Sequence, residues 1–328
     1  MKIDRRAFVT SVVGVAASRA GQAQAPSPPA WWPSRWGPGD EAGASNWITP
    51  AKVLEAAQWI RDGHIYRLGR TYEVGMPLFG TRSFALAIPG SPTGGPFGRN
   101  RLVYHDEFVA AQLGQVGTQF DGLGHIGIQL GPAGDKSQMR YYNGVTEQEM
   151  ASADGLLKLG IEKVKPLFTR GHLVDVAGLK GSILQRGYEI TMADVRAALA
   201  RQKMAEADIR QGDGIFFHTG WGRLWMKDNG RYNASEPGIG LEVARWVIEK
   251  GLCVTGADSW SVEVVPNPDK ELAFPVHGEL QTKHGIFNHE NLTFDALLAD
   301  GKHRFVYVFA PMPVKGATGS AGCPIAIT

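Results

Sequence analysis

Short apolar runs bounded by glycine or polar turns are the feature that most constrains the fold of this chain. Runs of this kind are typical of sheet strands buried on both faces. They alternate with segments of helical periodicity, and no change in composition divides residues 40–328. The sequence therefore predicts a mixed α/β protein with a single compact domain. The predicted strands are residues 66–68, 173–176, 214–219, 252–256 and 304–309.

Helix signals fall between these runs. Thr49 is a suitable N-cap before Pro50, and the apolar spacing that follows predicts a helix that continues until Gly63. Thr191 with Asp194 three residues later forms a capping box and predicts the start of a second helix. A third helix is expected over residues 241–250, before a glycine.

The N-terminal segment has the features of an export signal. Arg5 and Arg6 form a twin-arginine pattern, which is followed by an apolar run over residues 8–17 and small residues at 23–25. We expect residues 1–25 to be a twin-arginine signal peptide and the mature protein to reach the periplasm; the alternative is a frayed N-terminal arm. Residues 26–48 are rich in proline and tryptophan and predict an extended arm, which leaves 49–328 as the main domain.

Charge and motifs exclude several classes of protein. Once residues 1–25 are removed, the chain contains 30 Lys and Arg and 31 Asp and Glu. The mature chain therefore has no excess of basic residues with which to bind nucleic acid. No apolar stretch is long enough to place the mature form in a membrane. The dinucleotide fingerprint and the P-loop are both missing from the sequence, so we expect no nucleotide cofactor. A small-molecule substrate is the expected partner.

The segment 115–125, QVGTQFDGLGH, concentrates polar side chains among glycines. Gln115, Gln119 and Asp121 share alternation parity, so on an extended segment their side chains would leave the same face. Glycines allow the backbone to approach a ligand closely. By spacing alone this is a functional loop or a polar, glycine-rich surface loop.

The segment resembles the signature HxGTHxDxxxH of the cyclase family, which includes bacterial kynurenine formamidase and isatin hydrolase. Gly117, Thr118, Asp121 and His125 match it, whereas glutamines stand at both histidine positions. Residues 274–280 (FPVHGEL) and 290–292 (ENL) resemble a second family element. Residues 219–222, 32–37 and 315–320 carry further matches, so the resemblance covers nearly the whole mature chain.

This resemblance implies a mixed β/β/α fold of the swivelling type and hydrolysis of a small C–N substrate, such as an aryl formamide or a lactam, by metal-activated water. Asp121, His277 and Glu290 match ligands of one divalent ion, Zn²⁺ or Mn²⁺, with Gln115 and Gln119 lining or completing the site. Oxygen-rich ligands favour Mn²⁺.

The resemblance also implies roles outside the metal ligands. His125 matches the general acid/base, and Thr118 is expected to position the substrate or the oxyanion. Asp258 and Glu263 follow a predicted buried strand, where active-site loops commonly emerge, and are expected to contact substrate together with Trp221. Family members form oligomers, so we expect a homodimer or homotetramer.

Two alternatives stay open because neutral glutamine is a weaker ligand than imidazole. The first is a metal-free hydrolase that uses His125 with an acid such as Glu290. The second is a small-molecule-binding protein that kept the pocket without the chemistry.

Overall fold

The computed structural model describes residues 31–328, which form one compact unit from Trp31 to Thr328. The predicted signal peptide, residues 1–25, lies outside the described residues, as do the first five residues of the predicted arm. Within residues 31–328, no helix combines the length and the apolar character needed to cross a bilayer.

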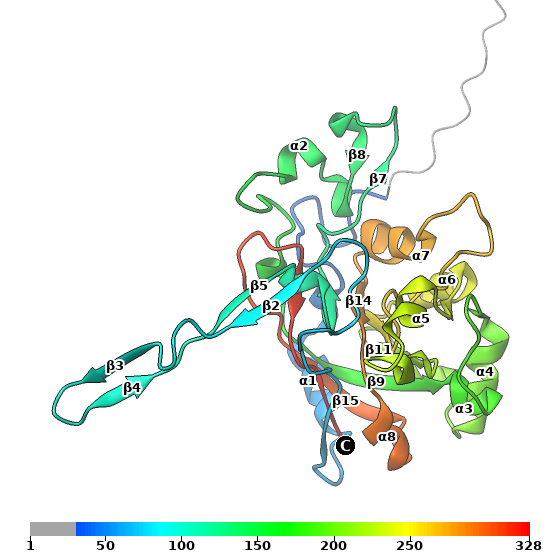
Figure 1. Ribbon diagram of the computed structural model, residues 1–328. Helices are drawn as coiled ribbons and strands as arrows, with labels where there is room; N and C mark the ends of the chain where they lie inside the picture. Colours follow the sequence, from blue (N-terminus) through cyan, green and yellow to red (C-terminus); the bar gives the residue numbers. More distant parts are fainter. Residues whose placement is uncertain (1–30) are drawn as a thin grey trace, which may run out of the picture. The chain divides into compact units, whose positions relative to one another are not determined.

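A nine-stranded mixed sheet forms the centre of the unit (Figure 1). Its order is β1-β17-β15-β9-β11-β13-β14-β6-β16, in which β9, β11, β13 and β14 run parallel and the other neighbours are antiparallel. The strands are β1 (Ile65–Arg67), β6 (Gln119–Asp121), β9 (Leu167–Asp175), β11 (Gly214–His218), β13 (Val254–Ala257), β14 (Phe287–Glu290), β15 (Arg304–Phe309), β16 (Gly319–Ala321) and β17 (Ile325–Ile327).

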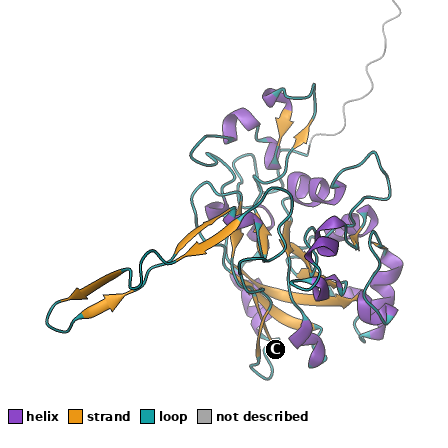
Figure 2. Cartoon of the chain, viewed as in Figure 1, coloured by secondary structure: helices purple, strands orange, loops and turns teal. Residues whose placement is uncertain are grey.

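Short helices and long loops surround this sheet (Figure 2). The predicted mixed α/β class with a single compact domain is therefore confirmed. The α-helices are α1 (Pro50–Ala57), α2 (Glu147–Met150), α3 (Val176–Lys180), α4 (Met192–Arg201), α5 (Asn229–Ala234), α6 (Leu241–Lys250), α7 (Pro275–His277) and α8 (Asp295–Ala299).

The capping signals explain where the longer helices begin. The Thr49 hydroxyl accepts from the backbone of Lys52 at α1, and the Thr191 hydroxyl does the same for Asp194 at α4. Helix α6 has the predicted bounds and ends at Gly251, whose φ of 66° is left-handed. The predicted end of α1 was wrong: the helix stops at Ala57, and Trp59 packs against the ring of His172 on β9.

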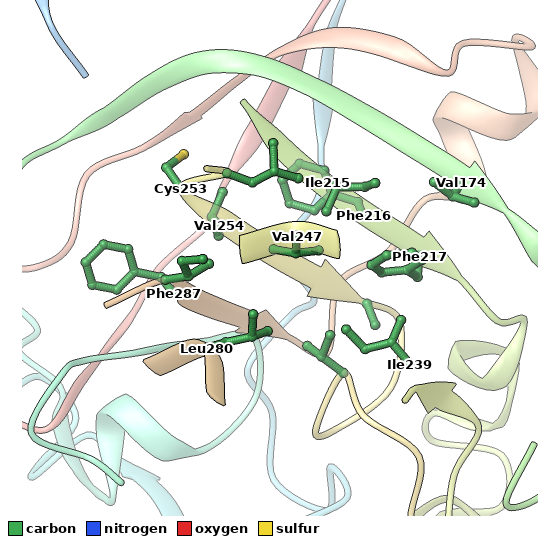
Figure 3. Packing of buried hydrophobic residues seen from close by; sticks show 14 of the residues in the cluster. Val174, Ile215, Phe216, Phe217, Ile239, Val247, Cys253, Val254, Leu280 and Phe287 are labelled. Carbon is green, nitrogen blue, oxygen red and sulfur yellow. The ribbon is translucent and has the colours of Figure 1, made fainter. Parts of the chain in front are cut away.

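The core lies between the sheet and its helices. Figure 3 shows Val247 of α6 beside side chains of β11 and β13. Ile215, Phe216 and Phe217 are consecutive on β11 and all fully buried, so both faces of this strand are covered. This agrees with the prediction made from the continuous apolar runs.

Four short pairings lie outside the central sheet. Strands β2 (Phe84–Ala87) and β5 (Phe108–Ala111) pair, and β3 (Gly94–Phe97) pairs with β4 (Leu102–Tyr104) beyond them. Residues 84–111 thus form a long hairpin arm that projects from the body in Figure 1. The sequence analysis did not predict this arm. The two remaining pairs join β7 (Ile128–Gln129) to β8 (Met139–Arg140), and β10 (Glu189–Ile190) to β12 (Gly238–Ile239).

The described part of the N-terminal segment packs onto the body. Asp40 accepts from the hydroxyl of Tyr142 at 2.6 Å, and the amide nitrogen of Ser34 donates to Asn143 at 2.7 Å. Trp36 and Trp47 pack against the main core. From Trp31 onward the predicted arm therefore lies over the surface of the domain.

Candidate active site

Strand pairing brings the two separate motifs together. Strand β6 pairs antiparallel with β14, and Gln119 stands opposite Glu290 in the register. The Gln119 amide nitrogen lies 2.5 Å from the Glu290 carboxylate. Both side chains are buried. Residues 171 positions apart in the sequence thus become neighbours through the sheet alone.

Asp121, His277 and Glu290 converge in one buried cluster, and each offers a ligand atom within 4.8 Å of the others. His277 Nε2 lies 3.2 Å from Glu290 Oε1 and 3.8 Å from Asp121 Oδ2. These are the three residues expected to hold an ion, and the fold places them together.

Glu263 lies behind His277. Its carboxylate contacts Nδ1 of His277 and accepts from the backbone of Val276 and of His277, at 3.2 and 3.0 Å. A carboxylate on one ring nitrogen orients the other nitrogen toward a metal and increases its basicity. Glu263 was expected to contact substrate, but the structure places it against His277, a candidate metal ligand.

Electrostatics at the cluster favour a bound positive charge. Burial and the nearby Asp121 carboxylate raise the pKa of Glu290 to about 7, against the effect of His277. Burial alone would lower the pKa of His277, but Glu263 and Glu290 raise it well above its usual value. Two close carboxylates are stabilised by a proton or by a divalent cation.

The donor set fits a divalent metal ion. Asp121 Oδ1 is buried and has no hydrogen-bond partner within residues 31–328, so a positive charge bound there would compensate its burial. Two carboxylates and one imidazole are a common ligand set for Zn²⁺ and Mn²⁺.

Above the cluster lies a cavity of about 150 Å³. His125 lines it with Gln119, His277 and Glu290. Burial lowers the pKa of His125 below its usual value, so the imidazole is neutral at pH 7 and can accept a proton. The other lining residues are Phe79, Arg82, Ile126, Trp260, Ser261 and Phe274.

Two polar residues at the site were missed from the sequence. Arg82 lines the cavity, and its guanidinium donates to Gln115 Oε1 at 3.3 Å. Gln281 donates to Asp121 Oδ2 at 3.2 Å. Gln281 follows His277 by four residues, a spacing that places two side chains on one helix face and could have indicated it. Arg82 precedes the hairpin arm and carries no local signal.

The remaining expected residues lie outside the cavity lining. Gln115, on the 3₁₀ turn η2 (Leu113–Gln115), lines a neighbouring cavity instead. The Thr118 hydroxyl bridges backbone atoms of Arg70 and Asn291, at 2.8 and 2.9 Å. The Thr118 hydroxyl therefore stabilises the loop beside Glu290 through backbone contacts.

Asp258 and Trp221 likewise make contacts that stabilise the fold. Asp258 accepts from the backbone and hydroxyl of Thr219, both at 2.7 Å, and from the backbone of Gly222. Trp221 is fully buried in a second apolar cluster, and its indole nitrogen donates to the backbone of Tyr232. The aromatic side chains that line the cavity are Phe79, Trp260 and Phe274.

Comparison with known proteins identifies the family to which this chain belongs. Residues 66–264 match the family described as putative cyclase. A crystal structure described as that of a novel cyclase is 31% identical, covers 89% of this chain and 98% of its own, and has a TM-score of 0.77. The chain therefore belongs to the cyclase family.

More distant structures share the fold. Isatin hydrolase A from Ralstonia solanacearum is 16% identical, with coverage of 85% of this chain and 96% of its own and a TM-score of 0.59. Isatin hydrolase A from Labrenzia aggregata, bound to benzyl benzoate, is also 16% identical, with coverage of 83% and 94% and a TM-score of 0.57. No curated protein matches the sequence.

Proposed function

We propose that this chain is a hydrolase that cleaves the C–N bond of a small aryl formamide or lactam with water as the nucleophile. The observation that carries the proposal is the buried cluster of Asp121, His277 and Glu290, with an unpartnered carboxylate oxygen, beneath a cavity that His125 lines. Isatin, for which the two structural neighbours are named, is an aryl lactam.

The cavity suits a flat ring with a polar head. Phe79 stacks on Trp260 with ring centroids 4.2 Å apart, and Phe274 lies edge-on to Trp260. A volume of about 150 Å³ accommodates one aromatic ring. The polar side chains at the cluster end then face the carbonyl and the nitrogen of the substrate.

When bound to Asp121, His277 and Glu290, a divalent ion would polarise the carbonyl and acidify a water molecule. The neutral His125 imidazole accepts a proton as water attacks the carbonyl carbon, and returns it to the leaving nitrogen. The C–N bond breaks: a formamide gives formic acid and an amine, whereas a lactam opens to a single amino acid. The Arg82 guanidinium is placed to stabilise the negative charge on the carbonyl oxygen.

Metal analysis together with activity tests this function. Purified protein should contain about one equivalent of Mn²⁺ or Zn²⁺, and it should hydrolyse formanilide or isatin. His125→Ala should lower kcat by about 100-fold or more, and Asp121→Asn should lose both metal and activity. His284→Ala is the matched control, because His284 is exposed and lies outside this cavity. Wild-type protein without metal and without turnover would contradict the proposal.

Two contacts favour a second candidate, the metal-free hydrolase. The Gln119 amide occupies one oxygen of Glu290, and the Gln281 amide occupies one oxygen of Asp121. Both carboxylates thus have neutral partners within the protein. Turnover that survives exhaustive chelation but is lost in His125→Ala would select this candidate over the metal-dependent one.

A further inference from the structure

A second cavity of about 370 Å³ opens at the carboxyl ends of β9 and β11. Ligands of α/β proteins commonly bind at this edge of parallel strands. The second cavity shares no lining residue with the candidate active site. Asp175 ends β9 and His218 ends β11, and the two stand opposite each other in the parallel register.

Asp175 and His218 form a hydrogen-bonded pair in the wall of this cavity. His218 Nδ1 lies 2.6 Å from Asp175 Oδ1, and the imidazole is only 5% exposed. At the other ring nitrogen, Nε2, the nearest carboxylate oxygen belongs to Asp258 at 3.9 Å, which is beyond hydrogen-bonding distance. Burial by itself would lower the pKa of His218, but the two carboxylates raise it above its usual value. The pair therefore favours a cationic imidazolium with one N–H unengaged.

Two arginines line the same cavity. Arg201 comes from the last turn of α4 and lies 3.5 Å from Asp175, while Arg223 comes from the turn η7 (Trp221–Leu224). Within the described part of the chain, no carboxylate lies within ion-pair distance of Arg223. Burial lowers the pKa of His303, the remaining titratable lining residue, so it contributes a neutral ring.

The charges around the cavity do not cancel. Two guanidinium groups and the His218 imidazole line it, and Asp175 is the one acidic side chain in its lining. Asp175 Oδ1 contacts His218 and its Oδ2 lies near Arg201, while the Asp258 carboxylate lies beside His218 outside the lining. Guanidinium groups bind carboxylate and phosphate oxygens through paired N–H donors, and an imidazolium adds a further charged donor. We propose that the cavity bounded by His218, Arg201 and Arg223 is a binding site for a small oxyanion, a carboxylate or a phosphate.

Calorimetric titration of the full chain tests this site. Sodium phosphate and sodium acetate are the two probes, titrated in a zwitterionic buffer at ionic strength held constant with NaCl. Wild-type protein should bind one of them saturably, with Kd on the order of 1 mM or lower. The more strongly bound probe distinguishes a phosphate site from a carboxylate site.

Variants locate the binding. Arg201→Gln and Arg223→Gln should each weaken binding by about tenfold or more. Arg196→Gln is the matched control, because this exposed arginine lies on the same helix and pairs with Glu206. Arg82→Gln tests whether the anion binds at the candidate active site instead. This variant should leave the titration unchanged. The inference is overturned if neither anion saturates, if both cavity variants bind like wild type, or if binding is lost only in Arg82→Gln.

Discussion

Among single residues, Glu263 shows how a side chain outside the ligand set can control the site. It holds Nδ1 of His277 and two backbone amides, so that Nε2 points to Asp121 and Glu290. A glutamine in its place would retain an acceptor oxygen but lose the negative charge that increases the basicity of the ring.

Glu263→Gln is therefore expected to weaken metal binding by about 10-fold to 100-fold without unfolding the protein. Competition with a chromogenic chelator measures the affinity. Glu279→Gln is the control, because Glu279 pairs with Lys283 and lies outside the cluster. Equal affinities for the Glu263 variant and the wild type would rule out this role.

Glu236 behaves differently, because it is fully buried and has no cationic partner among residues 31–328. Its Oε2 accepts from the backbone of Trp260 at 2.6 Å, while Oε1 has no partner among the described residues. Burial raises the pKa of Glu236 well above its ordinary value of 4.5. The folded protein therefore retains a proton that the unfolded chain releases above pH 4.5, so this residue lowers stability as the pH rises.

Glu236→Gln removes that titration. Relative to wild type, the variant should gain stability between about pH 5 and pH 7, by up to about 1.4 kcal/mol per pH unit. Urea unfolding at several pH values measures the difference. Glu271→Gln is the control, because Glu271 is exposed and the variant shows how replacing a carboxylate with an amide alone affects stability. A stability difference that stays constant with pH would contradict a neutral Glu236.

Among elements, helix α4 begins where its capping residues dictate. The Thr191 hydroxyl accepts from the amide of Asp194, and the Asp194 carboxylate accepts from the amide of Thr191. Thr191→Ala should lower the free energy of unfolding by about 1 kcal/mol, because a buried helix end loses a partner for its amide. Thr191→Ser keeps the hydroxyl and should restore most of the loss. If both variants unfold at the same urea concentration, the cap does not stabilise the helix.

The pairing of β6 with β14 is the element-scale contact that creates the site. Strand β6 has three residues and β14 has four. These short strands are enough to bring the site residues together, because the antiparallel register fixes which side chains stand opposite each other. Asp121 and Gln119 share a face of β6, as their alternation predicted. Gln115 does not join them, because the chain turns through η2 before the strand begins.

At the scale of the whole molecule, the hairpin arm of residues 84–111 stands out, because no other part of the described chain covers its apolar side chains. Its large apolar side chains are exposed, which is unusual on a monomer. Both ends of the arm connect to segments beside the site, at Arg82 and at Gln115. We propose that the arm packs on a second copy of this chain, which agrees with the homodimer or homotetramer expected from the sequence. The exposed side chains are Leu86, Ile88, Phe97, Leu102, Val103, Tyr104, Phe108 and Val109.

Shortening the arm tests this assembly. Ala87 pairs with Phe108, so residues 88–107 can be replaced by an Asn-Gly turn without breaking the β2–β5 pairing. Light scattering after size exclusion should give a dimeric or larger mass for wild type and a monomeric mass for the variant. Leu157→Ser, at an exposed apolar side chain outside the arm, should leave the mass unchanged. A wild-type monomer, or a variant with the wild-type mass, would contradict the proposal.

The sequence by itself determined the local structure and the chemistry available. Buried strands β11 and β15, the caps of α1 and α4, and the glycine end of α6 follow from short-range patterns. The resemblance to cyclases also pointed to Asp121, His277, Glu290 and His125, which the structure brings close together. The predicted export signal lies outside the described residues and stays a prediction.

Only the tertiary structure decided which side chains meet. It separated Thr118, Trp221 and Asp258 from the cavity, turned Glu263 toward His277, and brought Arg82 into the cavity lining. It also brought the ends of β9 and β11 side by side, where charged residues line a separate cavity. Local patterns reflect hydrogen bonds and side-chain periodicity within a few residues, whereas these contacts depend on strand order and register across the sheet. That order is set by the packing of the whole core, which short-range sequence patterns do not specify.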